Sequence, residues 1–315
     1  MEGQLYYQVT NSVATSKAFC NLTRDLSALN SKNFEHTSRD GHVVGYMVNL
    51  AILGGTSQIF RVSTAANSWK MRNSFRKFHA YRNLMFKNAG VSEDEKGRYG
   101  KTIRPYLNYD HYQAENGLSS NTVLVPRSDI AEFAMGDWTY SRLATTPLYE
   151  VNEATAEQEM GASRLTVADE WPLTICDTNQ VQASEDYTSG TYTTVGMIHS
   201  YNIDRMEVIT PTAEETVEGP ANPLAALIAS GNQAAGEILD ITNEQELEAP
   251  PYDLTDGGDS VEPIVRAIVK VPTTLGISRT SMFVPAGLFE LQVNGTGNYN
   301  LYIDVVGQVM CKDLQ

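Results

Sequence analysis

Apolar residues recur at every second position in many short stretches of the chain, and Gly, Pro, Asn and Asp separate one stretch from the next. A period of two among β-branched and aromatic residues indicates strands with one buried face. Many strands with long irregular connections favour an all-β antiparallel jelly-roll sandwich over a fold in which a helix follows nearly every strand. The predicted strands cover residues 4–13, 42–53, 58–64, 121–126, 130–145, 192–203, 264–272, 287–295 and 300–310.

Two stretches show the helical period instead. The first runs from Ser68, a possible N-cap, to Gly90, a possible C′ residue, and its apolar residues recur at helical spacing on one side. The second, residues 222–232, has Pro223 near its start and closes at Gly231. We therefore expect a sandwich with one long helix in an inter-strand connection and a second, shorter helix.

Charge is unevenly distributed along the chain, whose formal net charge is −15. Residues 61–104 hold 11 basic and 3 acidic residues, whereas residues 204–262 hold 14 acids and one base. This pattern predicts a first part of the sandwich at 1–203, an acidic and outward-facing insertion at 204–262, and the final strands at 263–315. An acidic stretch of this kind is also typical of a plain solvated surface.

The basic block contains the candidate site. At helical spacing, Arg72, Arg76 and Lys87 fall on one stripe beside the apolar face, together with His79 and Asn83. Such a stripe could contact phosphate or an acidic neighbouring subunit, or it could simply be a solvated helix surface. The interleaved aromatic residues indicate core packing rather than base stacking. The full candidate set is Lys70, Arg72, Arg76, Lys77, Arg82, Lys87, Arg98, Lys101 and Arg104.

Catalytic and metal-binding motifs are scarce. The sequence lacks a nucleophile elbow, a zinc-protease helix motif, a phosphate-binding P-loop and a dinucleotide fingerprint, so it predicts no catalytic residue and no cofactor. The three cysteines are far apart and indicate buried thiols in a reducing compartment. Asp253, Asp256 and Asp259 form a weak calcium candidate, but their spacing is not that of an EF-hand and favours an acidic turn.

Several stretches of the chain resemble a known family. The C-terminal "SRTSMFVPAGLFELQVNGTGNYNLYIDVVGQVM" is similar to the closing strands of small-virus jelly-roll capsid proteins. The stretches "NSWKMRNSFRKFHAYRNLMFKNAGV", "GRYGKTIRPYL", "GDWTYSRLAT" and "NPLAALIASGNQAAGEILDITNEQELEAPPYD" resemble capsid proteins of small circular Rep-encoding single-stranded DNA viruses. One departure is that the chain begins "MEGQLYYQVTNSV" rather than with the arginine-rich arm often found in that group.

The resemblance implies a coat protein that is made inside the host cell and assembles with copies of itself into an icosahedral shell around a small DNA genome. Packaged single-stranded DNA is then a possible partner, and the host receptor is unknown. The sequence contains no apolar run long enough for a membrane span. The alternatives are a double-jelly-roll capsid protein of a bacterial virus, a non-viral β-sandwich binding module such as a glycan binder, and an enzyme on a sandwich scaffold.

Overall fold

The structure, a computed structural model of the chain, describes residues 3–92, 94–97, 102–133, 138–144, 150–152, 157–159, 170–178, 194–206, 262–272 and 276–313. The helices are α1 (Leu22–Asn30), α2 (Trp69–Asn88), α3 (Tyr109–Glu115), α5 (Met197–Met206) and the short 3₁₀ helix η2 (Cys311–Asp313). The longer strands are β1 (Gln4–Val9), β2 (Thr15–Asn21), β3 (Val44–Gly54), β4 (Gln58–Thr64), β11 (Ile264–Val271), β12 (Gly276–Pro285), β13 (Leu288–Asn294) and β14 (Tyr299–Met310). The shorter strands are β5 (Thr122–Val123), β6 (Arg142–Ala144), β7 (Glu150–Asn152), β8 (Glu157–Glu159), β9 (Glu170–Thr174) and β10 (Val195–Gly196).

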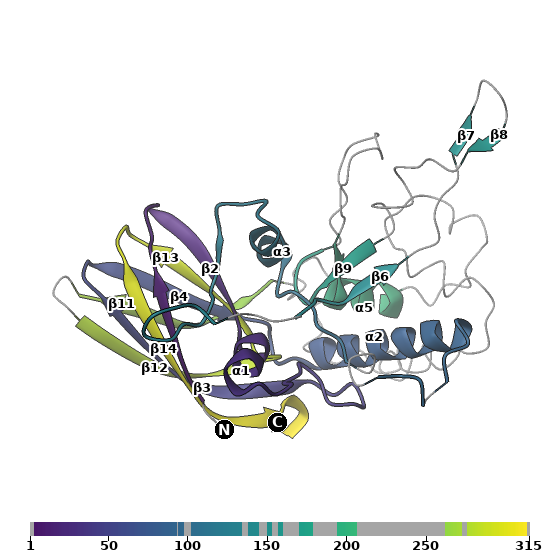
Figure 1. Cartoon of the computed structure of the whole chain (residues 1–315), viewed down its shortest axis with the longest axis horizontal. Helices are drawn as coiled ribbons and strands as arrows, with labels where there is room; N and C mark the ends of the chain where they lie inside the picture. The colour runs from purple at the N-terminus through teal and green to yellow at the C-terminus, as the bar shows by residue number, and fades with distance from the viewer. Residues whose placement is uncertain are drawn as a thin grey trace.

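Two large sheets face each other and form the sandwich at one end of the molecule (Figure 1). One sheet has the strand order β1-β14-β3-β12, and the other has the order β11-β4-β13-β2-β5. Neighbouring long strands are antiparallel throughout, while the two-residue β5 runs parallel to β2. The prediction of a mostly antiparallel all-β fold with few helices is therefore confirmed.

The core of the sandwich follows from the period of two that the sequence displays. Along β14, Leu301, Ile303 and Val305 are buried, whereas the intervening Tyr302 and Asp304 are exposed. Alternate side chains of the other long strands are buried as well, so each sheet packs one face against the facing sheet. The sandwich core thus accounts for the alternating pattern.

The connection between β4 and β11 carries most of the remaining elements. The eight long strands come from residues 4–64 and 264–310, and among the described residues in between only β5 joins them. Helices α2 and α5 and strands β6 and β9 lie beyond the end of the sandwich (Figure 1), where a second apolar core forms around Phe75, Phe78 and Tyr81. The expected division at 203 and 263 stays a prediction, because residues 207–261 lie outside the described part of the chain.

The structure corrects two predicted strands. Within 192–203, the described residues form a strand only at Val195–Gly196 (β10), and helix α5 begins at Met197. Met197, Ile198 and Tyr201 are buried at helical spacing, so contact with α2 overrides the β-rich composition of this stretch. Within 130–145, the described residues form a strand only at Arg142–Ala144. The helix predicted at 222–232 lies outside the described residues.

Several described elements were not predicted from the sequence, namely β2, α1, α3, the short strands β7, β8 and β9 and the helix η2, and β12 was expected only through the resemblance. Strand β2 leads directly into α1, where the side chain of Asn21 caps the helix by accepting a hydrogen bond from the backbone N–H of Arg24 at 3.2 Å. Helix α3 begins in the same way, with Asn108 Oδ1 accepting from the N–H of His111. β12 is the strand that the resemblance places before the closing hairpin. Of the described helices, none combines the length and the hydropathy needed to cross a bilayer.

Candidate functional site

Helix α2 holds six of the nine candidate cations and begins and ends where the sequence predicts. Ser68 Oγ accepts a hydrogen bond from the N–H of Met71 at 3.2 Å, which confirms it as the N-cap. Ala89 is the C-cap, and Gly90 follows with φ +74°, a conformation that glycine adopts at little cost. Phe75 and Phe78 face the second core and fix the rotation of the helix about its axis.

Two cations of α2 lie on its buried side. Lys77 is fully buried, and its Nζ donates a hydrogen bond to the carbonyl oxygen of Ser200 in α5 at 2.9 Å. The ammonium also lies 5.5 Å from the ring centroid of Tyr81. Lys70 is 7% exposed and precedes Lys77 by seven residues, which places both on the same face of a helix. Lys77 therefore belongs to the α2–α5 contact, and neither buried cation is available to a large polyanion.

Arg82 and Arg104 are also engaged inside the protein. One Nη of Arg82 donates to the backbone oxygen of Thr102. Arg104 is 6% exposed, forms an ion pair with Glu35 at 2.6 Å and stacks 4.1 Å from the ring centroid of Trp138. Both arginines therefore hold the segment after α2 against the rest of the fold.

Three cations of the predicted stripe remain accessible. Arg76 and Lys87 are exposed and Arg72 is half-buried. None of the three forms an ion pair with an acid among the described residues. The 15 residues from Arg72 to Lys87 span about 22 Å of helix. Arg72, Arg76 and Lys87, called the α2 stripe below, thus offer three separated positive charges along one side of the helix.

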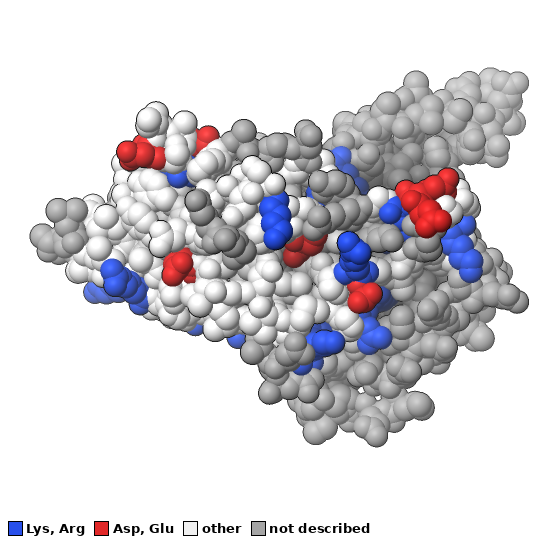
Figure 2. All heavy atoms as spheres, turned by 60° about the horizontal axis from the view of Figure 1, so that its bottom comes forward, with Lys and Arg blue, Asp and Glu red and all other residues white. Residues whose placement is uncertain are grey.

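The surface charge does not form one continuous positive patch on the face drawn in Figure 2. There, Lys and Arg side chains gather in several groups separated by uncharged surface, with Asp and Glu side chains among them. A polyanion that met this face would encounter discrete contact points rather than a uniformly basic surface. This distribution of charge suits ion pairing with individual acidic side chains better than nonspecific condensation of a nucleic acid.

Several candidate residues lie outside the described part of the chain. These are Arg98 and Lys101 of the basic set and Asp253, Asp256 and Asp259 of the calcium candidate. Among the residues that the structure does describe, no group of three or more His, Cys, Asp or Glu side chains is arranged to hold a metal ion. All three cysteines are buried free thiols.

Ion pairs that attach the long connection to the sandwich were not predicted from the sequence. Lys17 of β2 pairs with Asp110 of α3 at 2.6 Å. The buried Arg24 pairs with Asp25 at 2.9 Å and with Glu115 of α3 at 3.3 Å. Partners about 90 residues apart leave no periodic signal in one sequence, so only the folded arrangement brings these charges together.

Comparisons with known proteins give no relative for this chain. No protein-family model, no curated protein and no solved structure matches it.

Proposed function

We propose that the chain is the subunit of a viral shell and that its sandwich is a jelly roll. The observation that carries the proposal is the strand order. When the eight long strands are numbered along the chain, one sheet reads 1-8-3-6 and the other reads 5-4-7-2. In each sheet, strands from the first part of the chain alternate with strands from the last part. This alternation is the arrangement expected of two nested Greek keys.

Exposed apolar side chains on the outer face of the first sheet support self-association. Met47, Ile277, Tyr302 and Val306 are large apolar residues on the outer side of β3, β12 and β14, and each is at least 38% exposed. These exposed apolar side chains lie on either side of a polar row formed by Asn49, Asp304 and Ser281, and they are available for contact with another copy. In a shell, each permanent contact between copies should bury more than about 2,000 Å².

The α2 stripe is proposed to contact the acidic surface of a neighbouring copy, with packaged single-stranded DNA as the competing partner. Net charge favours the neighbour, because the chain carries 38 acids against 23 Lys and Arg. The excess of eight positive charges in residues 61–104 is small for condensing a genome, and two of the cations on α2 are buried. The stripe then fixes the relative position of two subunits by charge complementarity.

Charge removal distinguishes the two partners. The triple variant Arg72→Gln, Arg76→Gln and Lys87→Gln should fail to form particles if the stripe lies between subunits. The matched control replaces three exposed cations outside α2 and outside the outer face of the first sheet, Arg61, Lys270 and Lys312, by Gln and removes the same charge.

The DNA alternative gives a different result for the same variants. Particles of the α2 triple variant would then still form, and the slope of log affinity against log salt would flatten by about 0.7 for each phosphate that the variant no longer neutralises. Equal assembly defects in both triple variants would contradict a specific role for the stripe, since net charge alone would explain them.

The acidic segment 204–262 is proposed to lie on the outer face of the shell, because like charge repels it from an enclosed genome. Limited proteolysis of particles should cut first within residues 248–259, where Pro, Gly and Asp concentrate. Protection of this stretch while other sites are cleaved would instead place it inside the shell or within an interface.

Jelly rolls also occur in lectins and cupins, so a non-viral binding module is the main alternative from another class. A binding module should remain small at high protein concentration. A double jelly roll would need a second set of long strands, whereas the described residues contain one set of eight. Sedimentation of the purified chain therefore separates the shell subunit from the binding module directly.

A further inference from the structure

The outer face of the first sheet carries two stacked tyrosine rings. Tyr6 of β1 lies directly opposite Tyr302 of β14, and the two ring centroids are 4.9 Å apart with an interplanar angle of 31°. Tyr302 is 44% exposed. In the strand order β1-β14-β3-β12, Tyr6 covers the side of the Tyr302 ring toward β1, so the free side of the ring is the side toward β3. A free aromatic face of this kind can stack on a flat apolar surface of a ligand.

A small residue lies beside the free side of this ring. Strand β3 places Ala51 directly opposite Tyr302, and β12 places Arg279 directly opposite Ala51. Neighbouring strands are about 4.8 Å apart, so the backbones of Tyr302 and Arg279 are about 10 Å apart. Only the methyl group of Ala51 stands between these two long side chains on the outer face. The gap above Ala51 is therefore wide enough for a ligand one ring thick.

Hydrogen-bonding side chains lie at one end of this gap. Two residues along the strands, Asp304 lies directly opposite Asn49, and Asn49 lies directly opposite Ser281. Ser281 Oγ donates to Asn49 Oδ1 at 2.7 Å, which orients the amide and leaves its Nδ2 group as a donor for a ligand. Residues two apart on one strand are separated by about 7 Å, so these polar groups are within reach of a ring stacked on Tyr302.

The charges around the gap differ in sign and are both available. Asp304 and Arg279 are exposed, and neither forms an ion pair within the described chain. A carboxylate accepts hydrogen bonds from hydroxyl groups, whereas a guanidinium only donates them. At the other end of the gap lies the apolar, half-buried Leu53. A ligand in the gap thus meets an aromatic face, an apolar end, and both donors and acceptors.

We propose that this part of the outer face binds a neutral pyranose sugar, which stacks on Tyr302 above Ala51 and forms hydrogen bonds with Asp304, Asn49 and Arg279. A pyranose ring has an apolar C–H face and a rim of hydroxyl groups that both donate and accept, so it matches this mixed set of groups. A purely apolar ligand would desolvate the polar side chains without replacing their hydrogen bonds, and an acidic ligand would be repelled by Asp304. The ligand class is the terminal neutral sugar of a glycan.

The test is saturation-transfer NMR of the purified full chain with the methyl glycosides of glucose, galactose and mannose, followed by titration of each sugar that responds. Tyr302→Ala should weaken binding about tenfold, whereas Tyr302→Phe keeps the ring and should bind nearly as the wild type does. Asp304→Asn should also weaken binding about tenfold, because it removes a charge-assisted acceptor. Ala51→Leu fills the gap without removing any polar group and should abolish binding.

The matched control is Ile268→Ala, which removes an exposed side chain from the outer face of the second sheet and should leave binding unchanged. Tyr302 is also available for contact with another copy, so binding is measured at a protein concentration at which light scattering shows unassembled chain. The result is therefore independent of shell formation.

Four results would overturn the proposal. The first is no saturation transfer to any of the three glycosides, and the second is undiminished binding by Ala51→Leu. The third is an equal loss of binding in Ile268→Ala and Tyr302→Ala. The fourth is tighter binding of glucuronic acid than of methyl glucoside, which would identify an anion site at Arg279 instead of a site for neutral sugars.

Discussion

The fully buried His36 should make the folded chain sensitive to mild acid. Its Nδ1 donates to the carbonyl oxygen of Ala286 at 2.5 Å, and its Nε2 lies 3.1 Å from Thr23 Oγ1. Burial, reinforced by the charge of Arg104, lowers the pKa of His36 to about 4, although the contacts with Ala286 and Glu35 oppose this shift.

The direction and the size of this pH effect follow from the difference in proton binding between the unfolded and the folded chain. In the unfolded chain His36 has a pKa of about 6.5. Between pH 6.5 and pH 4 the unfolded chain therefore binds a proton that the folded chain does not, and stability falls as the pH falls through this window. Each pH unit is worth about 1.4 kcal/mol, so the His36 contribution that disappears between pH 7.5 and pH 5.0 is about 2 kcal/mol.

A variant isolates this contribution from other titrating groups. Burial raises the pKa of Asp177 and Glu290, which opposes acid destabilisation, so the pH dependence of the wild type alone is not diagnostic. His36→Gln keeps hydrogen-bonding capacity but cannot titrate. Denaturant unfolding followed by tryptophan fluorescence should give a wild type that loses about 2 kcal/mol more than this variant between pH 7.5 and pH 5.0.

The assembly state must be the same at both pH values, which light scattering checks. Parallel pH dependence in the wild type and in His36→Gln would refute the reasoning. It would mean that Thr23 and Ala286 together accommodate the protonated ring and offset the cost of burying its charge.

Two further substitutions test the packing around the candidate site and the turn before β13. Lys77→Gln should destabilise the chain by about 2–4 kcal/mol, because it removes a buried hydrogen bond and a contact with an aromatic ring. Arg76→Gln, at the adjacent exposed position, should change the stability by less than about 0.5 kcal/mol. Equal effects of the two substitutions would contradict the assignment of Lys77 to the core. Gly287→Ala should lower the stability by about 1–3 kcal/mol, because Gly287 has φ +69° and an added Cβ would lie 2.9 Å from the ring of Tyr46. The control is Gly55→Ala, because no atom lies within 4 Å of the Cβ that it adds. Equal unfolding midpoints for the two variants would contradict the predicted strain at Gly287.

The sandwich was largely predictable because its strands bury one face and leave the other in water. The period of two in β14 and β4 is visible without any knowledge of their partners. The same reasoning failed at residues 197–203, where Tyr and Ile favour a strand but contact with α2 stabilises a helix. Tertiary contacts of this kind decide local structure and leave only a weak signal in composition.

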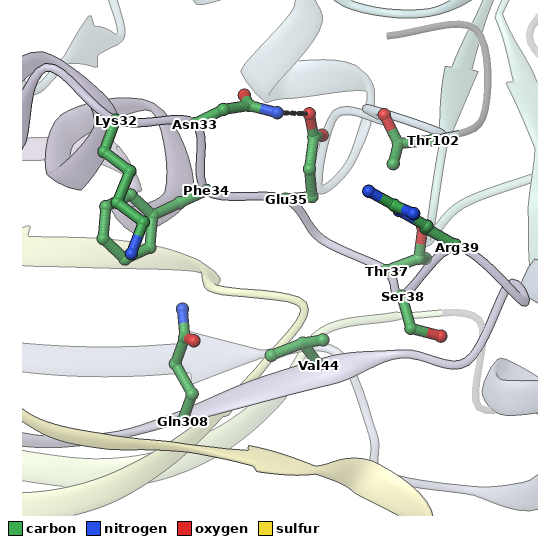
Figure 3. Close-up of a pocket in the computed structure, with 10 residues that line it drawn as sticks. All are labelled: Lys32, Asn33, Phe34, Glu35, Thr37, Ser38, Arg39, Val44, Thr102 and Gln308. Atoms are coloured by element: carbon green, nitrogen blue, oxygen red, sulfur yellow. Dashed lines mark hydrogen bonds between the residues drawn. The ribbon is translucent and has the colours of Figure 1, made fainter. Parts of the chain in front are cut away.

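The candidate site was predictable in part. Helical spacing correctly separates Arg76 and Lys87 from the apolar face of α2. Charge alone does not reveal that Lys77 is buried, although its alignment with Lys70 and Tyr81 on one face is a usable signal. A pocket lined by Phe34, Arg39, Val44 and Gln308 (Figure 3) could not be anticipated, because its walls come from segments up to about 275 residues apart in sequence.

Electron microscopy of the purified chain, combined with its sedimentation, tests the proposed shell function most directly. A shell subunit should give closed particles of uniform size, or discrete capsomers that close into particles when the salt concentration or the pH is changed. A chain that sediments as a monomer at high concentration, over the same range of salt and pH, would contradict the proposed function.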